Sequence, residues 1–386
     1  MNVIHLSPHF PRHYSLFARR LQKHGVEVLG ITDQKDENLT SELRSVLAGH
    51  YCVDQMENTE QVFRACRFFQ SNFGCLDRVE SHLESWIELE AAIREAFGIP
   101  GLRPGDLQFM KRKSLMKQVF ARAGVPTARG VIVESYEQCR SFINARYPVF
   151  IKPDSGVGAG DTFTIRSDND LRFFFASKNE RTYFLEEYLA GIIESFDGLT
   201  DREGNLAFFS GHVFSNDIHR IVSNDENLSY YNVRVLPKDI EAMGKQVVKS
   251  SGIKEKFFHI EFFRLADGSL RGLEINMRPP GGLTTDMFNF SADIDVYDWW
   301  AQIIATGRRD FSFDRKYHCA FVGCKNNRRY SHSHDEIVSH FGSRVLHWQP
   351  MNPIEVSVMG NFAYLVRSVD LEEVKEMIRF IQQEAQ

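Results

Sequence analysis

His259-Ile260-Glu261 and Glu274-Ile275-Asn276-Met277-Arg278 are the two stretches of sequence that decide the fold. They lie in strand-like runs, residues 257–263 and 270–277, which a turn at 266–269 joins. Side chains alternate between faces along a strand, so one face of the predicted hairpin carries His259, Glu261, Glu274, Asn276 and Arg278. Oxygen ligands at this density suit Mg²⁺, which binds a few carboxylates together with substrate phosphates. The alternative, from these residues alone, is a solvated hairpin face.

The composition sets the broad class of protein. The chain has 386 residues, of which 43% are hydrophobic and 25% charged, enough for two or three globular domains. A formal net charge of −5 supplies no basic field for nucleic acid. No apolar run reaches the length of a membrane span, which is about 18 residues, and the first residues resemble a buried strand rather than a secretory signal. The six cysteines lack a CxxC pair or a regular framework, so we predict reduced thiols and a cytoplasmic protein.

The first hundred residues alternate strand and helix patterns. Strands are predicted at 2–6 and 26–32, and helices at 14–24, 59–72 and 85–97. This alternation predicts a mostly parallel sheet covered by helices. No GxGxxG follows the first strand, so we interpret this sheet as a scaffold and substrate wall, not as the nucleotide site. The run of Gly and Pro at 98–105 marks the first boundary.

A glycine-rich loop is the main feature after that boundary. A helix is predicted at 114–123, and strands at 148–152, 163–166 and 182–185. Lys152 ends the first of these strands, and the loop that follows contains Ser155, Gly156, Gly158 and Gly160. Glycines let backbone N–H groups approach phosphate oxygens, and such a hairpin tip can close over a triphosphate. Lys152 would add a positive charge next to the phosphates, and Lys113 is a second candidate for a phosphate-binding lysine. A plain turn and a solvated basic face are the alternatives.

A possible hinge follows the strand at 182–185. Extended backbone at the mouth of a cleft can offer N–H and C=O groups to the edge of adenine, and Glu186, Glu187, Tyr188 and Leu189 lie at such a place. Glu194 could then accept hydrogen bonds from the ribose hydroxyls. Surface glutamates at a strand end are the alternative. Residues 216–231 are polar and aromatic, and their position between the hinge and the metal hairpin suggests a cover for the second substrate.

Taken in order, these motifs resemble the ATP-grasp superfamily, and within it the carboxylate–amine ligases of the L-amino-acid ligase and carbamoyl-phosphate-synthase-like branch. The shared order is a lysine before a helix, a lysine before a glycine hairpin, Glu-Glu-Tyr-Leu, His-x-Glu and Glu-x-Asn-x-Arg, between about residues 75 and 310. The resemblance implies an α/β (α+β) fold. An N-terminal α/β domain at 1–105 would precede an ATP-grasp domain at 106–310, with its lid at about 106–185 and its catalytic sheet at about 186–310. A small closing subdomain would occupy 311–386.

The resemblance also implies roles for residues. Lys113 and Lys152 would hold the phosphates of ATP, and Gly156 to Gly160 would form the lid. Glu187 and Leu189 would meet adenine through the main chain, and Glu194 the ribose. Glu261, Glu274 and Asn276 would hold Mg²⁺ or Mn²⁺, with Arg278 at the transferred phosphoryl group. The loop with Pro279, Pro280, Gly281 and Gly282 would receive the substrate carboxylate. His259 is either a proton acceptor for the amine or a buried, hydrogen-bonded histidine.

We therefore predict an ATP-dependent carboxylate–amine ligase that forms an acyl phosphate, then an amide bond, and releases ADP and phosphate. Its substrates would be a small-molecule carboxylate and an amine, with amino acids among the candidates, and a homodimer is compatible with the resemblance. A small-molecule kinase on the same fold and an ATP-binding regulatory protein without turnover are the rival functions. The histidines at 332–347 are interpreted as a polar loop rather than a metal site, because no Cys or acid at ligand spacing completes a site.

Overall fold

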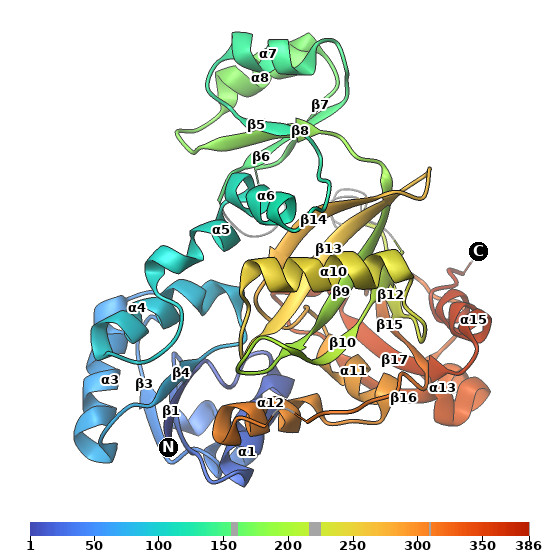
Figure 1. Ribbon diagram of the computed structural model, residues 1–386. Helices are drawn as coiled ribbons and strands as arrows, with labels where there is room; N and C mark the ends of the chain where they lie inside the picture. The colour runs from blue at the N-terminus through green and yellow to red at the C-terminus, as the bar shows by residue number, and fades with distance from the viewer. Residues whose placement is uncertain (156–160, 216–224, 309, 386) are drawn as a thin grey trace.

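The N-terminal part is a parallel sheet covered by helices, as predicted. The computed structural model describes residues 1–155, 161–215, 225–308 and 310–385. The strands β1 (Asn2–Leu6), β2 (Glu27–Thr32), β3 (Gly49–Cys52) and β4 (Arg78–Glu80) pair in the order β3-β2-β1-β4, all parallel. Helices α1 (Ser15–Lys23), α3 (Thr59–Phe73) and α4 (Ile87–Phe97) pack around this sheet (Figure 1).

A separate four-stranded unit lies at the top of Figure 1. Its antiparallel strands are β5 (Gly130–Ile132), β6 (Val149–Pro153), β7 (Phe163–Ile165) and β8 (Tyr183–Glu187), in the order β5-β8-β6-β7. Helices α7 (Tyr136–Ile143) and α8 (Asp168–Ser177) cover one side and complete a core of its own. This unit lies within residues 106–185, for which the resemblance implies a lid, whereas helix α6 (Lys113–Arg122) of the same range packs against the large sheet. Its Phe120 contacts Phe262 in the core of the large sheet.

The rest of the chain forms one nine-stranded sheet, in the order β14-β13-β9-β11-β12-β15-β17-β16, with β10 paired to β9. Its strands are β9 (Gly191–Thr200), β10 (Leu206–Ser210), β11 (His212–Phe214), β12 (Ser229–Asn232), β13 (Phe257–Leu265), β14 (Leu270–Asn276), β15 (His318–Cys324), β16 (Val345–Pro350) and β17 (Phe362–Ser368). Because β12 pairs with β15, the sheet continues across the boundary that we expected near residue 310. Strands β15, β16 and β17, from the range predicted as a closing subdomain, are therefore part of the large sheet.

Helices cover the large sheet on both sides. They are α10 (Lys238–Ser251), α11 (Thr284–Ala292), α12 (Val296–Thr306), α13 (His334–Phe341), α14 (Val356–Met359) and α15 (Leu371–Ile381). Apolar residues alternate along β9 and β13, so the face of the sheet that α10 covers is apolar, and Phe196, Phe258 and Ile260 on it are fully buried. No helix in the described part of the chain is both long and apolar enough to span a membrane.

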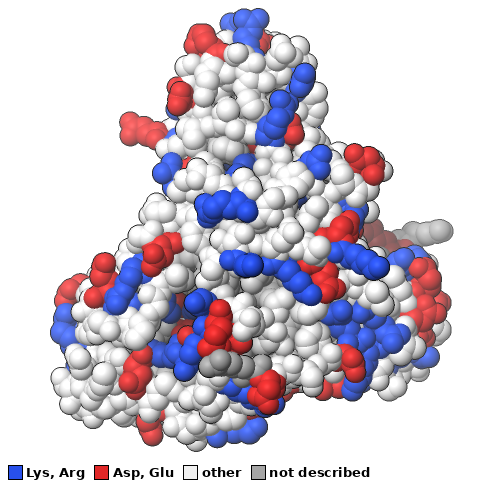
Figure 2. Space-filling model, viewed as in Figure 1, with Lys and Arg blue, Asp and Glu red and all other residues white. Residues whose placement is uncertain are grey.

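Buried ion pairs fasten the N-terminal part to the large sheet. Lys256, which immediately precedes β13, places its Nζ 2.7 Å from Oε2 of Glu80 and 2.9 Å from Oε2 of Glu90. Arg78 makes two hydrogen bonds to Glu255, of 3.0 and 2.9 Å. In Figure 2 acidic and basic side chains are interspersed over the visible face, with no broad field of one sign.

Candidate functional site

The predicted hairpin is present, and its register brings the two carboxylates opposite each other. Glu261 on β13 pairs with Glu274 on β14, and His259 pairs with Asn276. A bulge after Glu261 leaves Leu273 without a partner, and Gly272 then packs against the ring of Phe120. Glu261 and Asn276 are both buried residues.

The electrostatics of this pair favour a cation. Burial and the neighbouring Glu261 raise the pKa of Glu274, while Lys113 opposes the rise. Two carboxylates that repel each other in a buried place suit a divalent ion, which would offset their charge. Among the residues that the structure describes, no group of three or more His, Cys, Asp or Glu side chains could hold a metal ion. A site here would therefore also need the amide oxygen of Asn276, and phosphate oxygens of a bound nucleotide.

The two predicted phosphate lysines both lie near this pair. The Nζ of Lys152 is 2.5 Å from Oε1 of the buried Glu186, and Lys117 holds the other oxygen at 2.9 Å. Burial raises the pKa of Glu186, but the two lysines outweigh it and the net shift is downward. Burial lowers the pKa of Lys113, and Glu274 opposes this. Lys117 was missed, because in sequence it belonged to an apparently solvated basic face.

The start of α6 is tied to the end of β6. The backbone N–H of Lys113 donates to the carbonyl of Asp154 at 2.8 Å, and Ser114 and Arg112 bind the Asp154 carboxylate. These bonds fix Lys113 beside the strand that carries Lys152. Ser155 is exposed and forms a bridge with Arg112. The predicted lid glycines Gly156, Gly158 and Gly160 lie outside the described residues.

The predicted hinge connects β8 to β9. The backbone N–H of Glu187 donates to the carbonyl of Arg129 at 3.0 Å, and its carboxylate accepts from Arg129 Nε at 2.8 Å. Both the backbone N–H and the carboxylate of Glu187 are therefore engaged by Arg129. Tyr188 is exposed and Leu189 is partly buried, just before β9 begins at Gly191.

The prediction that Glu194 binds ribose is contradicted by strand geometry. Glu194 pairs with Phe262, one position out of phase with Ser195 opposite Glu261, so its side chain lies on the other face of the sheet. There Arg264 donates to both of its oxygens, at 3.1 and 2.8 Å, and also binds Asp239 of α10. The register of β9 against β13 cannot be derived from the sequence, so the face of the sheet on which Glu194 lies was not predictable from that of Glu261.

Arg278 and the loop after it lie at the end of the hairpin. Arg278 Nε is 3.1 Å from Oε2 of Glu84, and its Nη1 donates to the carbonyl of Pro279 at 2.9 Å. The buried Pro280 leads into Gly281, whose carbonyl accepts from Thr284 at 2.7 Å. Gly282 has a φ of +64°, and a Cβ there would lie 2.8 Å from the hydroxyl of Tyr230. Glycine is therefore needed for both conformation and space.

His259 belongs to a buried network that the sequence did not reveal. Its Nδ1 is 2.5 Å from Asp197 Oδ1 and its Nε2 is 3.2 Å from Glu261 Oε1. Burial lowers the pKa of His259, but Asp197 and Glu261 outweigh it and raise the pKa to about 10. His212 Nδ1 is 2.7 Å from the other oxygen of Asp197, to which Ser195 also donates. A protonated ring held by two carboxylates is a poor proton acceptor, which favours the buried, hydrogen-bonded interpretation.

A second polar cluster lies beside Arg278. Tyr14 is buried in this cluster. Burial raises its pKa, Arg278 opposes this, and Glu355 and Asp286 add to it, so these four groups lie near one another. Tyr297 donates to Asp286 at 3.0 Å, and burial raises the pKa of Asp286 to about 6. The cluster joins residues far apart in sequence, and no local motif marks it.

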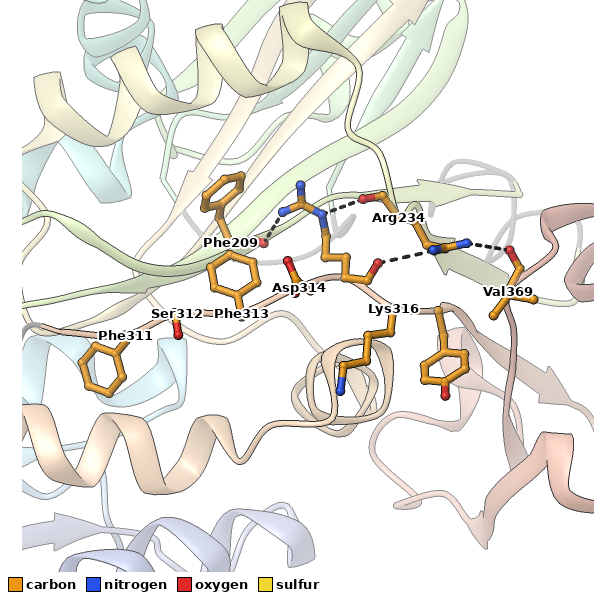
Figure 3. A pocket seen from close by; sticks show the side chains of 10 residues that line it. Phe209, Arg234, Phe311, Ser312, Phe313, Asp314, Lys316 and Val369 are labelled. Carbon is orange, nitrogen blue, oxygen red and sulfur yellow. Dashed lines mark hydrogen bonds between the residues drawn. The ribbon is translucent and has the colours of Figure 1, made fainter.

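A cavity of about 730 Å³ lies away from these residues (Figure 3). Phe209, Phe311 and Phe313 line it together with Arg234 and Arg315. The guanidinium groups brace the backbone: Arg315 donates to the carbonyls of Arg234 and Phe209 at 2.9 and 3.1 Å, and Arg234 donates to that of Val369 at 3.2 Å. These bonds support a structural role for the cavity wall.

Comparison with known proteins supports the same fold. No protein-family model matches the chain. A D-alanine–D-alanine ligase B of Clostridium perfringens is 28% identical over 196 residues, which are 47% of this chain and 61% of the relative. An L-arginine-specific L-amino acid ligase of Bacillus subtilis is 23% identical over 235 residues, 58% of this chain and 57% of the relative. Each alignment thus spans less than two thirds of the relative's length.

The similarity in structure covers nearly the whole chain. The crystal structure of an L-amino acid ligase from Bacillus licheniformis superposes with a TM-score of 0.75 and 15% identity, over 99% of this chain and 97% of the other. At this identity the match shows the fold. The chain therefore has the fold of the ATP-grasp superfamily, with a D-alanine–D-alanine ligase and an L-amino acid ligase among its homologues.

Proposed function

We propose that this protein is an ATP-dependent ligase that joins a carboxylate to an amine through an acyl phosphate, with release of ADP and phosphate. The observation that carries the proposal is the pairing of Glu261 with Glu274, with Lys113 and Lys152 beside it and Arg278 at its end. A carboxylate is a poor electrophile and repels a triphosphate, so the reaction needs cations at this point.

The residues around the hairpin suit a nucleotide. Lys113 and Lys152 would bind phosphate oxygens, and the main chain at Glu187 and Leu189 would meet adenine. Glu261, Glu274 and Asn276 would hold Mg²⁺ or Mn²⁺, which would neutralise the phosphates and orient them for transfer. Lys152 is already held by Glu186, so its ammonium group is fixed in position before nucleotide binds.

Arg278 and the following loop would bind the carboxylate that is phosphorylated. Burial lowers the pKa of Arg278, but Glu84 outweighs it and the net shift is upward, which keeps the guanidinium charged. It could therefore stabilise the phosphoryl group and the later tetrahedral oxyanion. The backbone of the loop, at Pro280, Gly281 and Gly282, would place the substrate close to Arg278.

The cluster at Tyr14 supports a substrate that carries a positive charge. Burial raises the pKa values of both Asp286 and Glu355, and no cation is among the causes for Glu355. An ammonium group bound there would offset the charge of these two acids. Small-molecule amino acids meet this requirement, and the names of the two curated relatives are consistent with it.

Phosphate release from ATP, with Mg²⁺ and pools of amino acids, tests the proposal. A ligase releases phosphate only when both substrates are present, and mass spectrometry would identify the amide product. A kinase would make a phosphorylated product without free phosphate, and a regulatory ATP-binding protein would do neither. Formation of AMP and pyrophosphate would mean adenylation and would overturn the acyl-phosphate mechanism.

A further inference from the structure

The floor between the hinge and the metal hairpin is apolar. β9 begins two residues after Leu189 and runs antiparallel to β13. Ser195 lies opposite Glu261, and the next pair toward the hinge on the same face is Ile193 opposite Phe263. If the base lies at the hinge and the phosphates lie at Glu261, as the proposed function has it, the ribose would lie over the buried Ile193 and the partly buried Phe263.

The carboxylate and the hydroxyl next to Ile193 in sequence already form hydrogen bonds within the protein. Glu194 lies on the opposite face, held at both oxygens by Arg264. The hydroxyl of Ser195 donates to Asp197. Arg271, which pairs with Phe263 from the other side, donates through Nη1 to the carbonyl of Leu270 at 2.9 Å, and as a guanidinium it offers no acceptor to a ribose hydroxyl. In the described part of β9 and β13, no carboxylate on this face between the hinge and Glu261 can accept a hydrogen bond from a ribose hydroxyl.

We propose that the protein binds the sugar of its nucleotide through this apolar surface, and so takes 2′-deoxy-ATP and 3′-deoxy-ATP nearly as well as ATP. The inference rests on the proposed function and adds the sugar specificity of the nucleotide site. A site that bonds a hydroxyl discriminates strongly against the analogue that lacks it, whereas an apolar surface does not. One hydrogen bond to a charged group would give a preference of about 10- to 150-fold.

Calorimetric titration of the full chain with Mg²⁺ and each nucleotide measures this preference directly. We expect the dissociation constants of ATP and both deoxy analogues to agree within about threefold. A preference for ATP of about tenfold or more would overturn the inference while leaving ATP binding, and the proposed function, intact. Failure to bind ATP at all would overturn both.

Substitutions sharpen the test. Ile193→Glu places a carboxylate on the site face, and Ile193→Gln places an uncharged acceptor there if the acid prevents folding. Either folded variant should raise the preference for ATP over one of the deoxy analogues, by about tenfold for the acid. Glu194→Gln is the matched control on the opposite face, and its ratio of dissociation constants should equal that of the wild type. A ratio that changes only in Glu194→Gln would restore Glu194 as the ribose ligand and reject the inference.

Discussion

The two faces of the sheet at β9 and β13 differ in whether their buried charges are paired with opposite charges. On one face Glu261 and Glu274 repel each other, and the pKa of Glu274 is raised. On the other face Glu194, Arg264 and Asp239 form a closed set of ion pairs. Buried carboxylates without matching cations therefore indicate a binding site better than buried ion pairs do, because the charges of an ion pair are already matched within the protein.

The largest effect is expected from replacing the carboxylates on the face that carries Glu261 and Glu274. Glu261→Gln and Glu274→Gln should each lower turnover by about 10³-fold or more, because a metal contributes several kcal/mol to charge stabilisation. ADP production at low millimolar Mg²⁺ measures this, with circular dichroism to show that the variants are folded. Near-normal turnover in either variant would remove the metal assignment.

Arg278→Met should lower turnover by about 10²- to 10³-fold with a much smaller loss of ATP affinity. The guanidinium lies at the end of the charged face, where it would act mainly once the phosphoryl group moves. Steady-state rates and ATP titration together separate the two effects. An equal loss of turnover and of ATP affinity would mean that Arg278 binds the ground state, as we propose for Lys113 and Lys152.

Lys152→Ala should raise the dissociation constant of ATP by about 10- to 150-fold, the value of one charge-assisted hydrogen bond. Calorimetric titration measures it. Lys111→Ala is the matched control, because Lys111 pairs with the exposed Glu88 and lies outside the site. If both variants bind ATP like the wild type, Lys152 does not bind the phosphates.

Asp197→Asn tests the balanced part of the site face. Burial raises the pKa of Asp197, but the two histidines outweigh it and hold it at about 2. A lowered native pKa stabilises the fold above the unfolded value of about 3.9, and this stabilisation is lost as the pH falls toward 2. The variant should therefore lose about 2 kcal/mol at pH 7 and show a flatter decline below pH 4. Denaturant unfolding at several pH values is the measurement, and parallel curves would contradict it.

Glu194→Gln has the smallest expected effect. Arg264 keeps Asp239 as a partner, and both ion pairs are partly exposed, so the loss of unfolding free energy should be about 1 kcal/mol. ATP affinity should not change. A large loss of affinity with normal stability would show that the two faces are not separate in function.

The local elements were predictable because their patterns are strong. The predicted strands at 2–6, 257–263 and 270–277 and the predicted helix at 59–72 correspond to β1, β13, β14 and α3. The hairpin determines its own register, so Glu261 and Glu274 could be placed together. The pairing of β9 with β13 could not be predicted, because it joins segments far apart in the sequence. The residues around Glu194 and Asp197 do not indicate which of these two side chains faces the site. The same holds for the joining of β12 to β15, which merged two expected domains.

The independent core of the lid has a consequence for cooperativity. Its buried residues, among them Ile151, Phe174 and Leu185, form a cluster separate from those of the large sheet. The chain enters the lid near Thr127 and leaves it at the β8–β9 junction. Such a unit can open at a free energy below that of global unfolding. Bound nucleotide, which would contact both sides of that junction, would raise the local stability of the lid by mass action and join two folding units into one.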